Sequence, residues 1–398
     1  MKLYAKRFTA VLLALALCLS LFPLTAAAES DAVSITSLSE ITDLSGSYKL
    51  TADLTVTEPF GSQAEPFNGT LDGDGHTVTI DIPAGSANTG MFAYLGSSAV
   101  VKNFVVDSAN VTSTASATGA IAGTSKGTIS DIRVQSLTVN GMEKTGGLVG
   151  VLESGAVLTR CCVDSGTVKK GSTSDTGFGG LVGESSGAVS LCSANVTLDH
   201  SEARPNYDYT GGIVGRNQYG SSIADSYFTG SFSEGSNKSY KIGGIAGDNS
   251  SGKITNCHFC GTLVSSASSQ GPIAYNGTVT NCYYLDTAYT SSTGYGTKKT
   301  ADEFAALAGT LGDVWENGTD GYPVLIWQTW KYSNTAIKYT VETYLETVDG
   351  DGYALSSTAE KKAEPGEAVS VEASAIEGFT FDAENENNVT SGEASADL

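Results

Sequence analysis

The sequence predicts an all-β protein: a right-handed parallel β-helix of seven rungs, a short C-terminal capping helix and a small β-rich module. One short motif recurs almost unchanged, as TGGLVG, FGGLVG, TGGIVG and IGGIAG from residues 145, 178, 210 and 242. The repeating unit is roughly 30 residues long and has no helical periodicity, and it cannot bury an apolar face alone. Stacking on neighbouring units supplies the core.

The first 28 residues form a secretory signal peptide. Lys2, Lys6 and Arg7 precede an apolar run over 10–22, and 26–28 is an A-x-A cleavage motif. No second apolar run is long enough to span a bilayer. The net charge of −21 argues against binding to nucleic acid or to anionic membranes. We therefore expect a secreted or cell-wall-associated protein.

Seven rungs follow from aligning the chain on the glycine that opens each motif. The steps between these glycines are 27 to 33 residues: Gly90, Gly119, Gly146, Gly179, Gly211, Gly243 and Gly271. After each motif, two apolar positions spaced by two predict the inward side of a strand. The first column holds Phe104, Ile132, Cys161, Cys192, Ser226, Cys257 and Cys282, and the second holds Val106, Val134, Val163, Ala194, Phe228, Phe259 and Tyr284.

The motif glycines suit the corners of such a coil. There the backbone needs either a positive φ or a close approach to the next rung, and glycine allows both. A β-propeller is the alternative, but its repeats are usually about 40–50 residues long. We therefore expect a β-helix.

These motifs resemble the GLUG repeats of bacterial surface proteins. The lead-in YKLTADLTVTEPFGSQAEPFNGTLDGDGHTVTIDI and the exit KTADEFAALAGTLGDVWENGTDGYPVLIWQ are similar to the segments that flank such repeats, so the resemblance covers 35–330. It departs from the pattern where Tyr94 and Tyr275 replace the last glycine of the first and final motifs. Atypical terminal repeats are typical of capping.

The exit segment predicts a helix. Thr300 and Glu303 make a capping box, Phe304 begins an apolar face, and Gly312 ends the element. We expect this helix to cover the open last rung, whose unpaired edge would otherwise invite aggregation. The solenoid with its caps thus occupies 29–331.

Residues 332–398 form a separate unit in this interpretation. Early alternation of apolar and polar residues and a Gly-Asp-Gly turn predict strands. The segment resembles the mucin-binding-type modules of Gram-positive surface proteins, although the chain stops where such a module continues into a closing strand. We expect a small β-rich module that either lacks its last strand or is truncated.

The cysteines and acidic residues suggest several kinds of site. A ladder of buried thiols is the main interpretation of the cysteine column, disulfides between rungs are an alternative, and Cys257-x-x-Cys260 lacks the second pair that a zinc finger needs. The stretch around Asp72 and Asp74 lacks the later ligands of a calcium loop, so a turn is expected. We predict no metal and no cofactor.

Enzymatic motifs are few. The chain has three histidines, none in H-E-x-x-H. Many β-helices are polysaccharide lyases or hydrolases, and Asp131 and Asp225 share one column. Asn103, Asn256 and Asn281 also occupy that column, so a hydrogen-bonding ladder at the corner is the better interpretation. We expect no catalysis.

A candidate binding surface comes from the insertion DHSEARPNYDYT. It ends in Tyr207, Asp208 and Tyr209, and Tyr240 follows at the matching edge of the next rung. Tyrosine beside polar groups suits contact with carbohydrate or protein, although the rings could equally shield a rung edge. The sequence thus predicts an adhesin-like protein for a host glycoprotein, mucin or polysaccharide, with a structural spacer and a polysaccharide-active enzyme as alternatives.

Overall fold

The computed structural model describes residues 32–331 with seven gaps, and four later strands. The gaps are 86–87, 115, 172–176, 200–208, 234–240, 264–268 and 290–294, and the later strands cover 337–346, 353–363, 368–370 and 391–393. The expected signal peptide lies outside the described residues.

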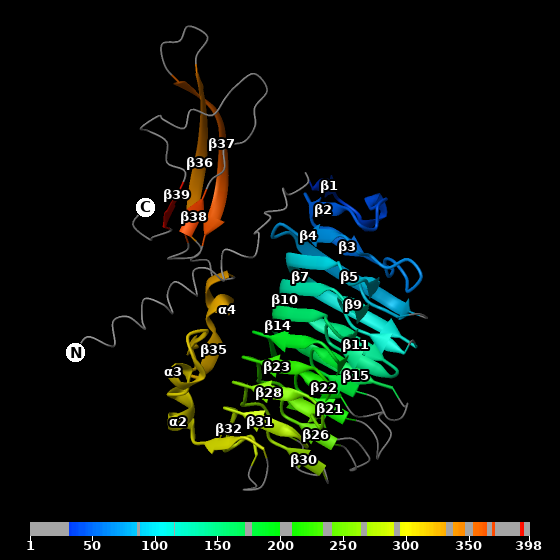
Figure 1. Ribbon diagram of the computed structural model, residues 1–398, viewed down its shortest axis with the longest axis vertical. Helices are drawn as coiled ribbons and strands as arrows, with labels where there is room; N and C mark the ends of the chain where they lie inside the picture. Colours follow the sequence, from blue (N-terminus) through cyan, green and yellow to red (C-terminus); the bar gives the residue numbers. More distant parts are fainter. Residues whose placement is uncertain are drawn as a thin grey trace, which may run out of the picture.

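Parallel strands stack into a β-solenoid, which confirms the predicted fold (Figure 1). Two of its sheets have six strands each. One contains β8 (Ala117–Thr118), β12 (Lys144–Gly146), β16 (Gly177–Gly179), β21 (Tyr209–Gly211), β26 (Lys241–Gly243) and β30 (Ser269–Gly271). The other contains β6 (Phe92–Leu95), β9 (Ala122–Ser125), β13 (Val149–Leu152), β17 (Val182–Ser185), β22 (Val214–Asn217) and β27 (Ala246–Asp248).

The third sheet has 21 strands and receives two segments from most rungs. Its strands are β1 (Val33–Ile35), β2 (Ser47–Leu50), β3 (Leu54–Val56), β4 (Thr70–Asp72), β5 (Thr77–Gly85), β7 (Val100–Ser113), β10 (Thr128–Val134), β11 (Leu137–Gly141), β14 (Val157–Val163), β15 (Gly166–Lys170), β18 (Ala188–Ser190), β19 (Ser193–Ala194), β20 (Thr197–Asp199), β23 (Ser222–Ala224), β24 (Tyr227–Phe228), β25 (Ser231–Phe232), β28 (Lys253–Thr255), β29 (His258–Phe259), β31 (Thr278–Thr280), β32 (Tyr283–Leu285) and β33 (Thr297–Lys299).

Each of the two six-stranded sheets contains six of the seven expected rungs, and a single bridge extends each sheet at one end. A single bridge joins Thr89 to Thr118 before the first glycine, and another joins Ala246 to Ala274 in the last rung. Both inward columns are buried as predicted. No residue of the first column is more than 2% exposed, and none of the second is more than 3% exposed.

The motif glycines are required because neighbouring rungs approach each other closely. A Cβ placed on the second glycine of one motif would collide with the carbonyl oxygen of the same glycine in the next rung, as at Gly147, Gly180 and Gly212. None of the glycines in these four motifs has a positive φ. Of the two expected reasons for glycine, close approach is therefore the one that applies.

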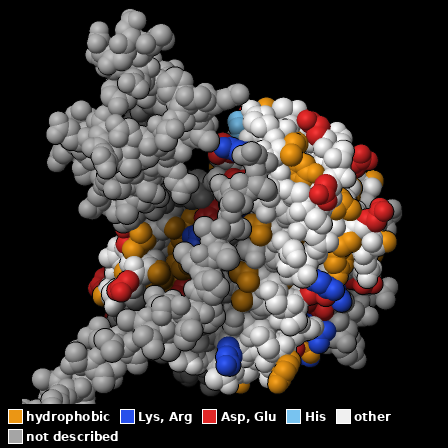
Figure 2. All heavy atoms as spheres, turned by 45° about the horizontal axis from the view of Figure 1, so that its top comes forward, with side chains coloured by type: hydrophobic (Ala, Val, Ile, Leu, Met, Phe, Trp, Pro, Cys, Tyr) orange, Lys and Arg blue, Asp and Glu red, His pale blue; other side chains and the backbone are white. Residues whose placement is uncertain are grey.

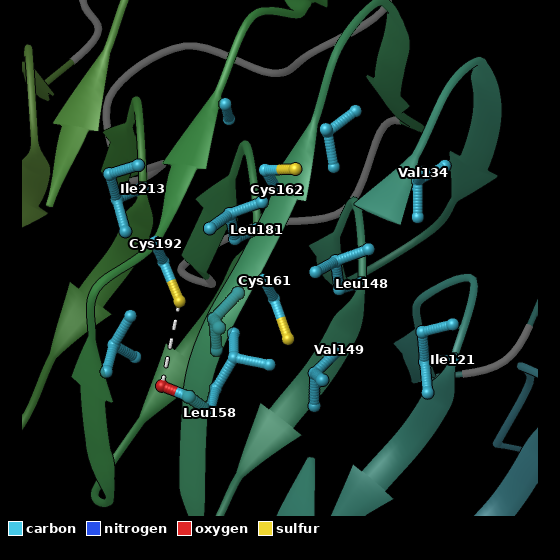
Figure 3. Packing of buried hydrophobic residues seen from close by; sticks show 14 of the residues in the cluster. Ile121, Val134, Leu148, Val149, Leu158, Cys161, Cys162, Leu181, Cys192 and Ile213 are labelled. Atoms are coloured by element: carbon cyan, nitrogen blue, oxygen red, sulfur yellow. Dashed lines mark hydrogen bonds between the residues drawn. The ribbon is translucent and has the colours of Figure 1, made fainter. Parts of the chain in front are cut away.

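The cysteine column lies inside the solenoid (Figure 3). Cys161 and Cys192 point into the core near Val149 and Leu158, and the Cys192 thiol donates to the Leu158 carbonyl oxygen over 3.7 Å. The six cysteines of the described part of the chain carry free thiols. Burial raises the pKa of the Cys161 thiol well above its ordinary value, so this thiol is neutral.

The C-terminal cap confirms the expected helix but places it differently. It comprises α2 (Ala301–Ala305), α3 (Ala308–Leu311), β34 (Trp315–Asn317), β35 (Pro323–Leu325) and α4 (Ile326–Lys331), and Thr300 and Glu303 form the capping box. This cap runs along the flank of the third sheet (Figure 1), where the Trp327 indole nitrogen donates to the Leu191 carbonyl oxygen over 3.0 Å. Its apolar face covers outward aromatic side chains there.

The last rung is instead covered by the chain that precedes α2. The Tyr289 hydroxyl donates to the Gln270 carbonyl oxygen over 3.4 Å, and the Tyr289 ring packs edge-on against Tyr284. A Cβ on Gly296 would lie 2.6 Å from Ile273 Cγ1, so this glycine permits the chain to cross the end of the core.

The segment after the solenoid contains two antiparallel strand pairs. β36 (Ile337–Glu346) pairs with β37 (Tyr353–Ala363), and β38 (Ala368–Ser370) pairs with β39 (Ser391–Glu393). Strands were expected in this segment. The resemblance to mucin-binding modules stays a prediction.

Candidate ligand-binding face

Tyr209 is the one predicted binding residue that the structure describes. It opens β21 and is partly exposed. Tyr207, Asp208 and Tyr240 lie outside the described residues. Of the predicted binding surface, only the surroundings of Tyr209 can therefore be described.

Two columns of residues lie around Tyr209. The register of one sheet aligns Gly177, Tyr209, Lys241 and Ser269, and Lys144 precedes Thr145, which pairs with Phe178 in the same sheet. The register of the next sheet aligns Glu184, Arg216 and Asp248. We call these two columns the Tyr209 face. Figure 2 shows basic and acidic side chains lying next to one another on one flank of the molecule.

Tyr209 holds two cations against its ring. The Lys241 Nζ donates to the Tyr209 hydroxyl oxygen over 3.1 Å and lies 4.5 Å from the ring centroid. The Arg216 guanidinium carbon lies 4.9 Å from the same centroid, and the Tyr275 ring is 6.0 Å from Lys241 Nζ. The hydrogen bond to Tyr209 is the main reason why the pKa of Lys241 is raised, so its ammonium stays charged.

The two carboxylates of this face are compensated by neighbouring donors. Glu184, whose side chain is 8% exposed, lies 3.3 Å from Lys144 Nζ and 3.5 Å from Arg216 NH1. Asp248 accepts a hydrogen bond of 2.8 Å from the Asn276 amide and lies 3.8 Å from Arg216 Nε. Cross-rung pairs of this kind lock neighbouring rungs together.

Lys241, Arg216 and Glu184 were not predicted as part of a site. The signal was present in the spacing: Lys241 follows Tyr209 by 32 residues, as Arg216 follows Glu184 and Asp248 follows Arg216. One repeat length places residues in the same column on adjacent rungs. The motif alignment followed apolar positions only, so it missed this polar column.

The suggested carboxylate pair is not assembled. Asp131 and Asp225 are separated by three rungs, because Arg160 and Leu191 hold the same corner position between them. Asp131 receives two hydrogen bonds of 2.8 Å from the Arg160 guanidinium, and Asp225 accepts one of 3.2 Å from the Asn256 amide. These contacts are those of the expected corner ladder.

The corner ladder also explains where positive φ angles occur. Seven residues at this corner have φ between 46° and 65°: Asn103, Asp131, Arg160, Leu191, Asp225, Asn256 and Asn281. Asparagine and aspartate tolerate this region best among residues other than glycine. The backbone conformation at this corner therefore explains why aspartate and asparagine recur in the column that includes Asp131 and Asp225.

The acidic turn near the N-terminus behaves as predicted. Asp72 accepts a hydrogen bond of 2.8 Å from the Asp74 backbone, and Asp74 and Gly75 take positive φ between β4 and β5.

Among the described residues, no group of three or more His, Cys, Asp and Glu side chains could hold a metal ion. The described part of the chain also contains no helix that is long and apolar enough to cross a bilayer.

Comparisons with known proteins match one rung to a described repeat motif. Residues 206–233 match the GLUG motif. The matched segment contains β21 to β25, including the part of the face that carries Tyr209 and Arg216. A segment of 131 residues is 37% identical to Halomucin from Haloquadratum walsbyi. This match spans 28% of the chain and 1% of Halomucin.

Two solved structures match this chain at low identity. One is described as "a putative immunoglobulin A1 protease from Bacteroides ovatus", with a TM-score of 0.47, 19% identity, and coverage of 74% of this chain and 92% of that one. The other, "IgA1 Protease", has a TM-score of 0.44, 17% identity, and coverage of 63% and 21%.

Proposed function

We propose that the chain is an exported, adhesin-like protein whose solenoid displays the Tyr209 face to glycans or host glycoproteins without catalysing a reaction. The observation that carries this proposal is the arrangement of Tyr209, Lys241 and Arg216. An aromatic ring and two cations on adjacent rungs form a polar and aromatic surface at a rigid spacing of about 4.8 Å.

The matches to known proteins support a surface role. The GLUG motif covers the rung that carries Tyr209, and the similarity to Halomucin fits a protein that faces the outside of a cell. A regular solenoid suits display because each strand is held by its neighbours, so side chains on its surface need little further ordering before they bind.

A structural spacer is the second candidate. The same face contains cross-rung contacts, such as Lys144 with Glu184, that stiffen a rod whether or not it binds anything. In that case the cations hold Tyr209 against the rung edge, and the surface has no ligand.

Binding to a glycan and mucin array separates display from spacer. The full mature chain should bind a subset of the array, and Tyr209→Ala should remove most of that binding. Tyr219→Ala is the matched control, because Tyr219 is 88% exposed and is not part of the Tyr209 face. Silence of the wild type across the array would support the spacer and contradict display.

An enzyme is the third candidate, and we predict no turnover. Inverting glycosidases hold their carboxyl groups about 6.5–9.5 Å apart, whereas three rungs of about 4.8 Å separate Asp131 from Asp225. The chain should therefore release neither reducing sugars nor unsaturated oligosaccharides from uronic or neutral glycans, with or without calcium. Steady release that Asp225→Asn abolishes would contradict the proposal.

A further inference from the structure

Lys241 forms no ion pair within 4 Å in the described part of the chain. Its polar contact there is the Tyr209 hydroxyl, and its other near neighbours are the Tyr209 and Tyr275 rings. The Asp248 carboxylate raises the pKa of Lys241 only through a longer-range charge interaction. Lys144, by contrast, pairs with Glu184, and Arg216 pairs with both Glu184 and Asp248. An ammonium outside any such pair and beside two aromatic rings is a candidate contact for an anionic group.

Tyr209 and Lys241 together present two hydrogen-bond donors. The Tyr209 oxygen accepts the hydrogen bond from Lys241, so its own proton is left to donate. Lys241 has further N–H groups, and the donor atoms are 3.1 Å apart. This spacing suits the oxygens of one carboxylate or sulfate group.

We propose that the Tyr209 face recognises acidic saccharides, with the carboxylate or sulfate group bound between Lys241 Nζ and the Tyr209 hydroxyl. This inference rests on the proposed glycan-display function and specifies its ligand class. A saccharide is favoured over an acidic peptide because Tyr275 flanks Lys241 on its other side, and tyrosines beside a bound anion can contact the apolar face of a sugar ring.

The test uses the full mature chain and immobilised saccharides. The probes are hyaluronan and polysialic acid as carboxylate carriers, heparin and desulfated heparin as the sulfate pair, dextran as the neutral polymer, and poly-glutamate as the acidic peptide. We expect binding to carboxylated or sulfated polymers that weakens as sodium chloride rises from 50 to 500 mM, on the order of the Debye screening of an exposed ion pair. Dextran should not be bound.

Three variants identify the site. Lys241→Gln should weaken binding about tenfold or more, since a hydrogen bond to a charged group contributes that much. Tyr209→Phe should weaken it about threefold to tenfold while keeping the ring. Lys253→Gln is the charge-matched control and should change nothing, because Lys253 is exposed on β28 in another sheet. Circular dichroism and thermal melting check that each variant is folded.

The outcomes separate this inference from the proposed function. Binding to neutral glycans that Lys241→Gln leaves intact would keep display and overturn acidic-saccharide recognition. Binding to poly-glutamate without any saccharide would also overturn it, in favour of an acidic peptide. No binding to any glycan would overturn both, and the chain would then be a spacer.

Discussion

His258 shows how one side chain acquires a role from its surroundings. It follows an inward cysteine, so it points outward from its strand, yet the cap buries it completely. Its ring stacks on Tyr227 and meets the edge of Phe304, and its Nε2 donates to the Pro323 carbonyl oxygen over 2.9 Å. Burial lowers the pKa of His258 to about 3, so the folded protein holds it neutral.

Stability should therefore depend on pH through His258. The unfolded chain takes up a proton near pH 6.5, whereas the folded chain resists protonation down to about pH 3. The stabilisation is fully present above pH 6.5 and falls by up to about 1.4 kcal/mol per pH unit below it. Urea unfolding between pH 4.5 and 7.5 should show a steeper acid loss for the wild type than for His258→Phe.

His76→Phe is the control for this measurement, because the His76 side chain is 31% exposed whereas His258 is fully buried. It should leave the slope of stability against pH almost unchanged. Equal slopes for the wild type and His258→Phe would show that His258 is not held neutral.

The cysteines make a second prediction at the residue scale. Their contribution comes from apolar burial, and the described cysteines are not bridged. The melting temperature should therefore shift by only about a few degrees in dithiothreitol, since no loop closure is lost. Intact bridges in mass spectrometry together with a large loss of stability on reduction would contradict this.

At the scale of elements, the cap acts as a strap on the flank of the solenoid. Trp327 reaches Leu191, and the Gln328 amide bridges Ser193 at 2.6 Å and the Tyr227 hydroxyl at 2.8 Å. These contacts join α4 to strands more than 100 residues earlier in the chain. The cap thus protects an outward aromatic surface that the rungs alone would expose to water.

Removing the Trp327 side chain should release this strap. Trp327→Ala should cost about 3–5 kcal/mol of unfolding free energy, as a large aromatic truncation does, and should speed hydrogen exchange in β19, β24 and the cap. Trp327→Phe keeps most of the packing and should cost less. Unchanged exchange in β24 after Trp327→Ala would mean that the cap does not protect the flank.

At the scale of the whole molecule, each rung depends on its neighbours. The Ile245 backbone accepts from the Ile213 nitrogen over 2.9 Å and donates to the Ile273 oxygen over 2.8 Å, and its side chain is fully buried. Stability in such a stack is nearly a sum of rung terms and nearest-neighbour terms. A fault in one central rung therefore also weakens the rungs on either side.

Ile245→Asp should unfold more than its own rung, because an unpaired charge in the core cannot be solvated. We expect a loss of cooperative unfolding and of hydrogen-exchange protection in the rungs that contain Ile213 and Ile273. Ile245→Val is the matched control and should cost about 0.5–1.5 kcal/mol. An unchanged melting temperature for Ile245→Asp would contradict its inward position.

The sequence by itself determined the solenoid. Its repeat length sets which residues stack, so the buried columns ending at Cys282 and Tyr284 followed from spacing alone. The capping box at Thr300 was equally local, since its partners are three residues apart. The candidate site could be predicted only in part. The spacing of 32 residues between Tyr209 and Lys241 is visible in the sequence, but the sequence does not show which charged side chains contact each other.

Only the tertiary structure decided where the cap lies and what surrounds Tyr209. Trp327 and Leu191 are 136 residues apart, and no period relates them, because the cap leaves the solenoid and folds back along it. The contacts of Arg216 could not be predicted from the sequence either. Its long side chain can reach a carboxylate on either neighbouring rung or the Tyr209 ring in the adjacent column. Local pattern specifies a strand and its facing, whereas contacts between non-repeating segments depend on the shape of the assembled surface.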